Sequence, residues 1–456
     1  MQSCHDIAIV GGGASAVLAS LQFLRRARQP LQLAMLAPDP QPGRGVAYST
    51  RRPEHLLNVP AERMSALAER PDDLVEWLAT EPDHAGIDRH ELASRFIARR
   101  DYARYLAARL EQARAASPAR LEQVQARVLA LHAQDGHWRL ETTAGPVLAR
   151  RVLLAAGNAA RPLPARGATT LSGPALLQAW DYEAVAALDP DSDVAVVGTG
   201  LSMADVLVSL EAGGHRGRIH LLSRHALLPL AHAGGHHGVD PELDVASLHP
   251  LPLRARLRRL RAQARDARDR GLPWQAVMEA LRPHGHALWQ SLPPAEQRRF
   301  LRHGMRWWDI HRHRLAPEVA ARLEQLRAQG RLHLHRARLD LVVSGSRCVR
   351  LSARRADGSE LCLDVDHIIN ATGMETRIQA MRNPLLEQLL GTGLARPGGH
   401  GMGLDSDPAG RVVDAAGQAR DGLRVIGSLR IGQEWETIAV PDLRLQAAAI
   451  AGDWLG

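Results

Sequence analysis

"DIAIVGGGASAVLAS" (residues 6–20) and "DVAVVGTGLSMADVLVSL" (residues 193–210) share one pattern, and this pattern decides the fold. In each stretch a run of apolar residues meets two glycines one residue apart, and apolar residues at helical spacing follow. Such a pattern predicts a buried strand that turns sharply into a helix, the opening of a βαβ unit. We therefore expect an α/β protein with two Rossmann-like dinucleotide-binding domains.

Both glycine turns are suited to a phosphate. In Gly11-x-Gly13 and in Gly198-x-Gly200 the first glycine permits the tight turn, and the second lets a pyrophosphate approach the backbone. The following helix then presents its free N–H groups and positive dipole end. A tight turn without a ligand would explain either copy taken alone.

An internal echo supports the ligand-binding interpretation. "LLAAG" (153–157) and "INATG" (369–373) each close a strand downstream of a glycine turn. Two dinucleotides in one chain usually mean a flavin and a nicotinamide, between which hydride passes. FAD and NAD(P)H are therefore the expected cofactors.

The length of 456 residues predicts more than one domain, and 45% hydrophobic with 23% charged residues is typical of soluble proteins. We expect the first part of an FAD-binding domain at 1–165 and an NAD(P)H-binding domain at 191–372. The latter contains a helical insertion at about 236–330. Residues 373–456 should form the C-terminal part of the FAD-binding domain.

Around the first turn, short polar residues and further glycines are candidates for contacts with FAD. "GRG" (43–45) offers close backbone approach and an arginine for the pyrophosphate, and "HLLNVP" (55–60) offers polar groups for an isoalloxazine edge or, alternatively, a loop cap. The predicted FAD residues here are Gly11, Gly13, Ala14, Ser15, Ala16, Asp39, Arg44, Gly45, His55 and Asn58.

One position departs from the usual pattern. The second strand of such a unit normally ends in an acidic residue that binds a ribose hydroxyl, but Ala37 stands there, with Asp39 two residues on. Either Asp39 reaches back to the ribose or other groups hold it.

The second turn predicts the nicotinamide site, formed by Gly198, Gly200, Leu201, Ser202, Ser223 and Arg224. Ser223, Arg224 and His225 follow the second strand, where a 2′-phosphate would lie. An arginine there fits NADPH better than NADH, although a surface arginine is an equally simple explanation in this arginine-rich chain.

The net charge of +8 comes entirely from arginine, because the chain contains no lysine. This excludes Schiff-base chemistry, pyridoxal-phosphate attachment and a Walker-A lysine. The densest basic run, "RARLRRLRAQARDARDR" (254–270), is interpreted as a solvated helical face, with an anion- or nucleic-acid-binding face as the alternative. We expect no nucleic-acid partner.

Cys4, Cys348 and Cys362 are too scattered for a disulfide framework or a thiolate metal site, which favours a reducing compartment. A strand pattern begins within five residues of the N-terminus, so we expect no signal peptide and a cytoplasmic location. No apolar run is long enough for a membrane span.

Several blocks together resemble a bacterial family of FAD/NAD(P)-binding proteins that includes many uncharacterised oxidoreductases. They are spread along most of the chain: "GRGVAYST" (43–50), "HLLNVPAERMSA" (55–66), "VVGTGLSMADV" (196–206), "LLSRHALLP" (221–229), "RWWDIHRHRLAP" (306–317), "INATG" (369–373) and "GQEWETIAVPDLRLQA" (432–447). The resemblance implies FAD on the first unit and the C-terminal tail, where Gly427, Thr437 and Ala439 join the FAD candidates. It also implies a nicotinamide on the second unit.

The activities associated with such proteins are monooxygenations with NAD(P)H and O₂. A small planar substrate is expected, with urate, converted to 5-hydroxyisourate in purine breakdown, as the first candidate. The alternatives are an FAD-dependent NAD(P)H reductase or dehydrogenase and an amine N-hydroxylase acting on another small molecule.

The substrate side is predicted by "GMRWWDIHRHRL" (304–315), where two tryptophans can stack on a flat ring and basic groups can bind an anion, or can simply pack against the core. The histidines of "AHAGGHHG" (231–238) lack carboxylates or cysteines at ligand spacing, so we expect a glycine-rich loop and no metal. The candidates for catalysis are His236, His237, Arg306, His311 and His313.

Overall fold

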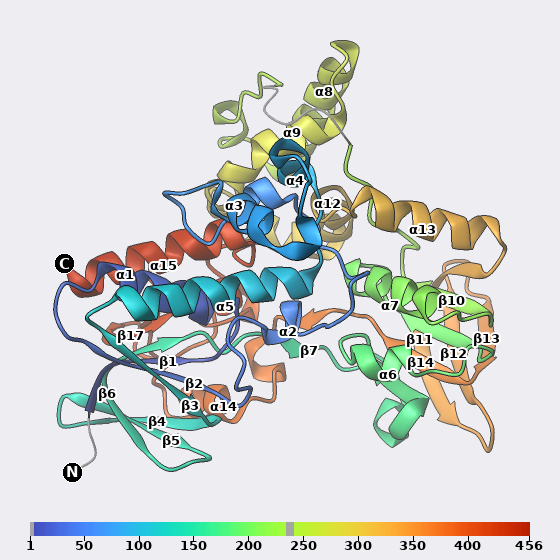
Figure 1. Cartoon of the computed structure of the whole chain (residues 1–456). Helices are drawn as coiled ribbons and strands as arrows, with labels where there is room; N and C mark the ends of the chain where they lie inside the picture. Colours follow the sequence, from blue (N-terminus) through green and yellow to red (C-terminus); the bar gives the residue numbers. More distant parts are fainter. Residues whose placement is uncertain (1–3, 234–240) are drawn as a thin grey trace. The chain divides into compact units, whose positions relative to one another are not determined.

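The chain divides into two compact units in a computed structural model that describes residues 4–233 and 241–456. The first unit comprises Met1–Arg51, Val59–Ala159 and Glu375–Gly456, and the second comprises Arg52–Asn58 and Ala160–Met374 (Figure 1). Two short strands, β7 (Ala159–Ala160) and β15 (Met374–Glu375), lie where the chain passes between the units. The predicted division placed all of 1–165 in one domain, whereas the structure groups 52–58 with the second unit.

The first unit is built on a sheet in the order β16-β17-β6-β1-β2-β3. β1 pairs in parallel with β2 and with β6, and Val10 lies opposite both Leu36 and Leu154. The carboxyl ends of these three strands therefore meet at one edge, where the first glycine turn begins. The strands are β1 (Cys4–Val10), β2 (Gln32–Ala37), β3 (Arg120–Gln125), β6 (Val147–Leu154), β16 (Arg411–Val413) and β17 (Ala419–Val425).

A hairpin joins this sheet. β4 (Val128–Gln134) and β5 (His137–Thr142) pair antiparallel, and β5 continues the pairing to β6. Asp135 and Gly136 both have positive φ, as the two-residue turn that "DG" predicts requires.

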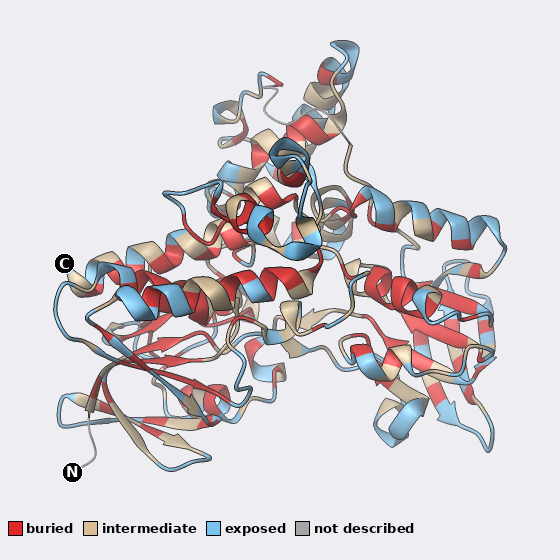
Figure 2. Ribbon diagram, in the orientation of Figure 1, coloured by how far each residue is buried: buried red, intermediate tan, exposed pale blue. Residues whose placement is uncertain are grey.

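Three helices lie side by side over one face of the first sheet: α1 (Ala14–Arg26), α5 (Arg99–Ala116) and α15 (Val440–Leu455) (Figure 1). Their sheet-facing sides are buried, while their outer sides are exposed (Figure 2). α14 (Pro384–Gly391) packs against β4, where the side chain of Gln388 exchanges hydrogen bonds with the backbone of Leu131. The C-terminal segment thus supplies a strand pair and two helices to a unit begun at the N-terminus.

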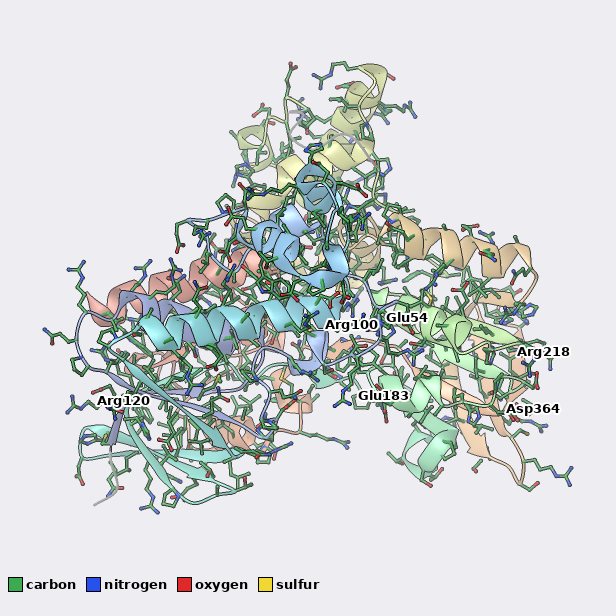
Figure 3. The ribbon with its side chains drawn as sticks, viewed as in Figure 1. Glu54, Arg100, Arg120, Glu183, Arg218 and Asp364 are labelled. Atoms are coloured by element: carbon green, nitrogen blue, oxygen red, sulfur yellow. The ribbon has the colours of Figure 1, made fainter. Side chains whose placement is uncertain are left out.

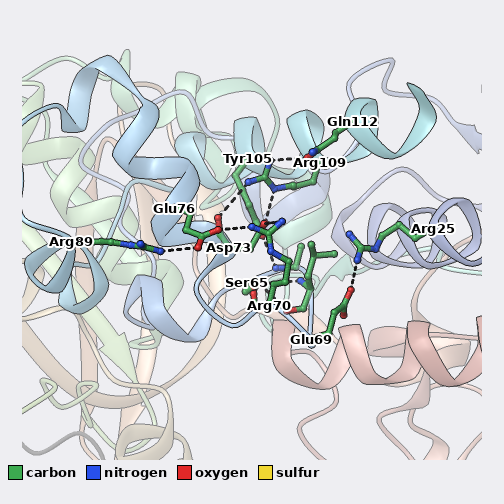
Figure 4. Close-up of polar contacts among 12 residues, drawn as sticks. Arg25, Ser65, Glu69, Arg70, Asp73, Glu76, Arg89, Tyr105, Arg109 and Gln112 are labelled. Carbon is green, nitrogen blue, oxygen red and sulfur yellow. Dashed lines mark hydrogen bonds and ion pairs between the residues drawn. The ribbon is translucent and has the colours of Figure 1, made fainter. Parts of the chain in front are cut away.

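A buried carboxylate fastens α3 (Asp73–Thr80) to α5. Two other small helices pack nearby, α2 (Gly45–Tyr48) against α5 and α4 (Arg89–Ser94) against α3. Asp73 is fully buried, and its Oδ2 accepts from the Tyr105 hydroxyl at 2.7 Å and from Arg109 Nε at 2.6 Å (Figure 4). Burial and the neighbouring Asp73 carboxylate raise the pKa of Tyr105, so this phenol stays a donor.

The second unit is built on a sheet in the order β13-β12-β11-β10-β9-β14-β8. β8, β14, β9, β10 and β11 run parallel, and β12 and β13 continue antiparallel. The strands are β8 (Leu176–Gln178), β9 (Val194–Val197), β10 (Ile219–Ser223), β11 (Leu332–Ser344), β12 (Val349–Arg355), β13 (Glu360–Val365) and β14 (His367–Asn370).

Two partly apolar stretches, 332–335 and 339–343, flank the sequence Arg336-Ala337-Arg338. Both belong to β11, in which the pairing with β12 shifts between Leu339 and Leu341. Arg336 and Arg338 are exposed, so the polar run between the two apolar segments fits one continuous strand.

Between β10 and β11 the chain forms the predicted helical insertion. Its helices are α8 (Leu253–Asp269), α9 (Trp274–Leu281), α10 (Gly285–Gln290), α11 (Pro294–Arg299), α12 (Met305–Arg312) and α13 (Pro317–Ala328). A π-helical turn, Phe300–Gly304, precedes α12. The basic run lies on α8, whose exposed arginines are Arg254, Arg258, Arg259, Arg261, Arg265 and Arg268.

Charged side chains gather at the outer surface of the second unit. Arg218 and Asp364, both labelled in Figure 3, form ion pairs with Asp193 and Arg350, respectively. Exposed pairs of this kind contribute at most about 1 kcal/mol each, so the apolar core carries the stability of the unit. In the described part of the chain no helix is long and apolar enough to span a membrane.

Candidate functional site

The first glycine turn (Gly11–Gly13) requires glycine at its start. Gly11 has a φ of +130°, and a Cβ built on it would lie 2.1 Å from the carbonyl oxygen of Ala155. The Gly11 amide donates to Leu36 O at 2.8 Å, and the Ala155 amide donates to Val10 O at 2.8 Å. Three strands therefore close around a residue that cannot carry a side chain.

The helix that follows leaves its N-terminal amides for a ligand. α1 begins at Ala14 with Gly13 as N-cap, no side chain caps it, and its first turn contains no acidic residue. A Cβ on Gly13 would lie 3.5 Å from the Cα of Gly45, so a second glycine backbone passes close by. Gly45 begins α2, and Arg44 is the N-cap residue of that helix. The structure thus brings "GRG" to the first turn, as expected of a pyrophosphate site.

Asp39 does not reach back to the turn. Its carboxylate is exposed, and Oδ1 accepts from the amide of Gln41 at 2.9 Å within its own loop. A Cβ on Gly12 would lie 2.6 Å from the Cβ of Ala37, so the small residue at the usual acidic position packs directly against the turn.

The C-terminal segment also meets the first turn. Gly427 has a φ of +78°, and a Cβ on it would lie 2.7 Å from Ser15 Oγ. The Gly427 amide donates to Gln446 Oε1 at 3.0 Å, and Gln446 Nε2 donates to Glu434 Oε2 at 2.6 Å. Thr437 is fully buried and contacts this network.

Gln446 of α15 was not among the candidates, because an ordinary helical glutamine carries no signal in the sequence. Ala439 is the N-cap residue of α15, the position from which the amides of that helix begin.

His55 and Asn58 belong to segment 52–58 of the second unit. His55 is fully buried, and its Nε2 lies 2.7 Å from Ser209 Oγ and 3.2 Å from Asp205 O. Its ring packs on Tyr182 at 4.9 Å between centroids. The Asn58 carbonyl oxygen lies 2.9 Å from His232 Nε2. These contacts fasten segment 52–58 within the second unit, and the contact of both residues with a flavin stays a prediction.

The second glycine turn (Gly198–Gly200) repeats the first in detail. Gly198 has a φ of +108°, and a Cβ on it would lie 2.2 Å from Ala371 O. The Gly198 amide donates to Leu222 O, and the Ala371 amide donates to Val197 O. Ala371 of "INATG" thus occupies the place that Ala155 of "LLAAG" has in the first unit. This shared role explains why the two short sequences are alike.

The helix after the second turn again has free amides. α7 (Leu201–Ala212) has Gly200 as N-cap, with no capping side chain and no acidic residue in its first turn. Ser202 Oγ accepts from the indole of Trp180 at 3.2 Å. Ser223 Oγ accepts from Thr199 Oγ1 at 2.9 Å, so this serine stabilises the turn itself.

An arginine patch (Arg224, Arg306 and Arg336) surrounds His225 beside this turn. Arg224 follows β10 and is exposed, and exposed Arg336 lies on the adjoining strand, paired with Ser223. Burial and the charges of all three arginines lower the pKa of His225, which places the three guanidinium groups near one imidazole. The sequence could not predict Arg336 here, because more than a hundred residues separate it from Arg224.

Arg306 contacts the second glycine turn. Its Nη2 lies 3.3 Å from Thr199 O, and its Nη1 would lie 3.9 Å from a Cβ on Gly200. The predicted role of this residue on the substrate side stays a prediction.

The expected stacking surface does not form. Trp307 is 55% exposed, whereas Trp308 packs edge-on against Phe300 with centroids 6.1 Å apart, so the two indoles do not make one platform. His311 Nδ1 lies 2.7 Å from Trp307 O in its own helix. His313 follows the end of α12, and its amide donates to Asp309 O.

His236 and His237 lie outside the described residues. Within the described ranges, no group of three or more histidine, cysteine or acidic side chains could hold a metal ion. The three cysteines are free thiols.

Comparisons with known proteins agree with this geometry. Residues 8–159, about a third of the chain, match the model of a family described as FAD-NAD(P)-binding. No curated protein matches the chain in sequence.

Among solved structures, ornithine hydroxylase from Pseudomonas aeruginosa in its reduced form is similar, with 16% identity, a TM-score of 0.68 and coverage of 99% of both chains. An ornithine N-hydroxylase from Kutzneria sp. 744, with reduced FAD, NADP⁺ and L-ornithine, has 15% identity, a TM-score of 0.69 and the same coverage. Thioredoxin reductase from T. acidophilum has 11% identity and a TM-score of 0.52, over 99% of this chain and 97% of that one. The predicted fold class, two Rossmann-like units as in two-dinucleotide flavoproteins, is confirmed.

Proposed function

We propose that this chain is a flavin-dependent monooxygenase that uses NADPH and O₂ to hydroxylate the primary amine of a small molecule. The observation that carries the proposal is the pair of matching glycine turns, one in each unit, in a chain that follows ornithine N-hydroxylases over 99% of its length. The fold alone admits other chemistry, so the choice of reaction rests on the residues discussed next.

The residues present fit both cofactors. FAD would lie on the first unit, at Gly11, Gly13, Gly45 and Ser15, with Gly427 closing on Ser15 from the C-terminal segment. The uncapped start of α1 would bind the FAD pyrophosphate.

NADPH would lie on the second unit at Gly198 and Gly200. We assign the 2′-phosphate to Arg224 and Arg336, because guanidinium groups bind phosphate with paired hydrogen bonds. A dinucleotide without that phosphate would leave both charges unused, so NADPH is favoured over NADH.

The protein's own contribution is to bind and orient the cofactors and the substrate, and to exclude water from them. Bound flavin supplies the transfer of electrons from the nicotinamide to O₂. The glycine turns let the backbone approach the pyrophosphates closely, because glycine has no side chain that would keep them apart. The Gln446 side chain holds the Gly427 amide in place, and the buried Glu434 contact holds Gln446 in turn.

An amine replaces urate as the favoured substrate for two reasons. The residues expected to bind urate do not converge, because Trp307 is exposed and Arg306 contacts the second glycine turn. Similar structures that span the whole chain include enzymes named for ornithine hydroxylation.

A thiol–disulfide reductase, the second candidate, is disfavoured by the cysteines. Such an enzyme passes electrons through thiols near its flavin. Here Cys4 begins β1, at the opposite end of the strand from the glycine turn. Cys348 immediately precedes β12, and Cys362 lies on β13, both in the second unit. None of them lies at either glycine turn.

The test uses the full-length protein, reconstituted with FAD and supplied with NADPH. Ornithine, lysine, cadaverine, putrescine and urate are added separately, and NADPH oxidation, O₂ uptake, hydrogen peroxide and hydroxylamine product are measured together. We expect one amine to yield hydroxylamine in near-stoichiometric proportion to NADPH.

Other outcomes contradict the proposal in distinct ways. Urate-dependent O₂ uptake with a hydroxylated purine would restore the urate hypothesis. Rapid reduction of an added dye or disulfide with no hydroxylated product from any compound would favour a reductase.

A further inference from the structure

The helical insertion delivers one arginine to the nicotinamide site. α12 is joined to the loop after β10 by backbone hydrogen bonds, from Leu230 N to Ile310 O at 3.2 Å and from Leu315 N to Leu230 O at 2.9 Å. This fastening fixes where the first turn of α12 lies, and Arg306 is in that turn. The insertion is therefore part of the wall around the second glycine turn.

The guanidinium of Arg306 is held near the turn without being fully used. Its Nη2 lies 3.3 Å from Thr199 O and 3.4 Å from Leu227 O, and Nη1 lies 3.4 Å from the Asp309 carboxylate. All three distances exceed the usual ~2.9 Å, and a guanidinium has five N–H groups to donate. Its side chain is 24% exposed, so an anion can reach it.

The position of Arg306 differs from that of the other two arginines in the patch. Arg224 follows the end of β10, and Arg336 lies on β11 opposite Ser223, the last residue of β10, where an adenosine ribose would be. Arg306 lies over Thr199 and Gly200, at the start of α7, where the backbone approaches a pyrophosphate.

We propose that Arg306 binds the pyrophosphate of the nicotinamide dinucleotide, as a clamp supplied by the helical insertion. Resting on the proposed function for the identity of the ligand, this assigns Arg306 to the second glycine turn and not to the substrate. The charge balance supports it, because one partly exposed carboxylate, Asp309, faces the guanidinium, and two phosphate oxygens offer stronger acceptors.

The test compares NADP⁺ with NAD⁺, which share the pyrophosphate and differ only in the 2′-phosphate. Dissociation constants are measured by calorimetry on the FAD-loaded full chain. Arg306→Gln should weaken both dinucleotides by the same factor, about tenfold or more. Arg224→Gln should weaken NADP⁺ by about tenfold and leave NAD⁺ within about twofold.

Two further variants guard against a folding defect. Arg306→Lys keeps the charge and should recover part of the lost affinity for both dinucleotides. Arg302→Gln changes an exposed arginine one turn earlier in the insertion and should leave both affinities unchanged. Melting temperatures of all variants should stay close to that of the wild type.

Three results would overturn the inference. Unchanged affinities in Arg306→Gln would make the arginine purely structural, and a loss confined to NADP⁺ would place it on the 2′-phosphate. A wild-type protein that binds neither dinucleotide would remove the proposed function together with the inference, whereas the first two results leave that function standing.

Discussion

Gly11→Ala tests the first glycine turn most directly. The added methyl would lie 2.1 Å from Ala155 O, about 1 Å closer than carbon and oxygen tolerate, and the φ of +130° is unfavourable for alanine. Adopting such a backbone costs roughly 1–3 kcal/mol, and relieving the overlap costs roughly 1–3 kcal/mol more. We therefore expect the free energy of unfolding of the first unit to fall by about 2–6 kcal/mol.

The assay has two readouts, thermal unfolding and the ratio of bound flavin to protein after gel filtration. The displaced backbone would no longer let a pyrophosphate approach the turn closely, so flavin retention should fall as well. Gly391→Ala is the matched control, since Gly391 ends helix α14 in the same unit and a Cβ there meets nothing within 4 Å. It should change stability by no more than about 1 kcal/mol.

The reasoning fails if Gly11→Ala melts at the wild-type temperature and keeps its flavin. That result would mean that the backbone at the end of β6 can shift without cost to make room for the methyl group, and that glycine is not required at residue 11. If the wild type itself bound no flavin, the loss of stability would still test the geometry of the turn.

Three further predictions concern the buried side chains of Asp73, Gln446 and His220. Asp73→Ala should cost about 3–5 kcal/mol in urea unfolding, because it leaves two donors without an acceptor, whereas exposed Glu76→Ala should cost less than about 1 kcal/mol. Gln446→Leu removes the acceptor of the Gly427 amide and should cost about 1–3 kcal/mol while weakening flavin retention. Burial and the neighbouring imidazoles lower the pKa of His220 to about 4, so the folded state keeps this ring neutral. Stability should therefore fall by up to about 2 kcal/mol between pH 7 and pH 5, where the unfolded chain takes up the proton, and a pH series of His220→Gln should be flatter by that amount.

Much of the fold could be predicted because its signals are local. Strand, glycine turn and helix follow one another within 23 residues in the first unit and within 19 residues in the second. The echo of "LLAAG" and "INATG" was visible too, although only the structure shows that Ala155 and Ala371 each close a turn with a carbonyl oxygen.

Contacts between distant segments could not be predicted in the same way. His55 lies in a stretch whose sequence is typical of a cofactor-binding loop. Its ring is nevertheless buried against α7, where its contact Asp205 lies 150 residues further along the chain. Arg306 and the two tryptophans beside it suggested one binding surface, but on a helix consecutive side chains point in different directions. The arginine therefore reaches the second glycine turn, whereas Trp308 packs against Phe300.

The first unit is assembled from three stretches of chain, and this has a consequence for how the protein is made. On the ribosome, β1 and β6 emerge early, but their partner β17 and the covering helix α15 are translated only after all of 160–374. Until then, the N-terminal half of the nascent chain exposes one edge of its sheet and one face of α1. Chaperones recognise exposed surfaces of this kind. Moving the 375–456 stretch forward by circular permutation should shorten that wait and raise the soluble yield.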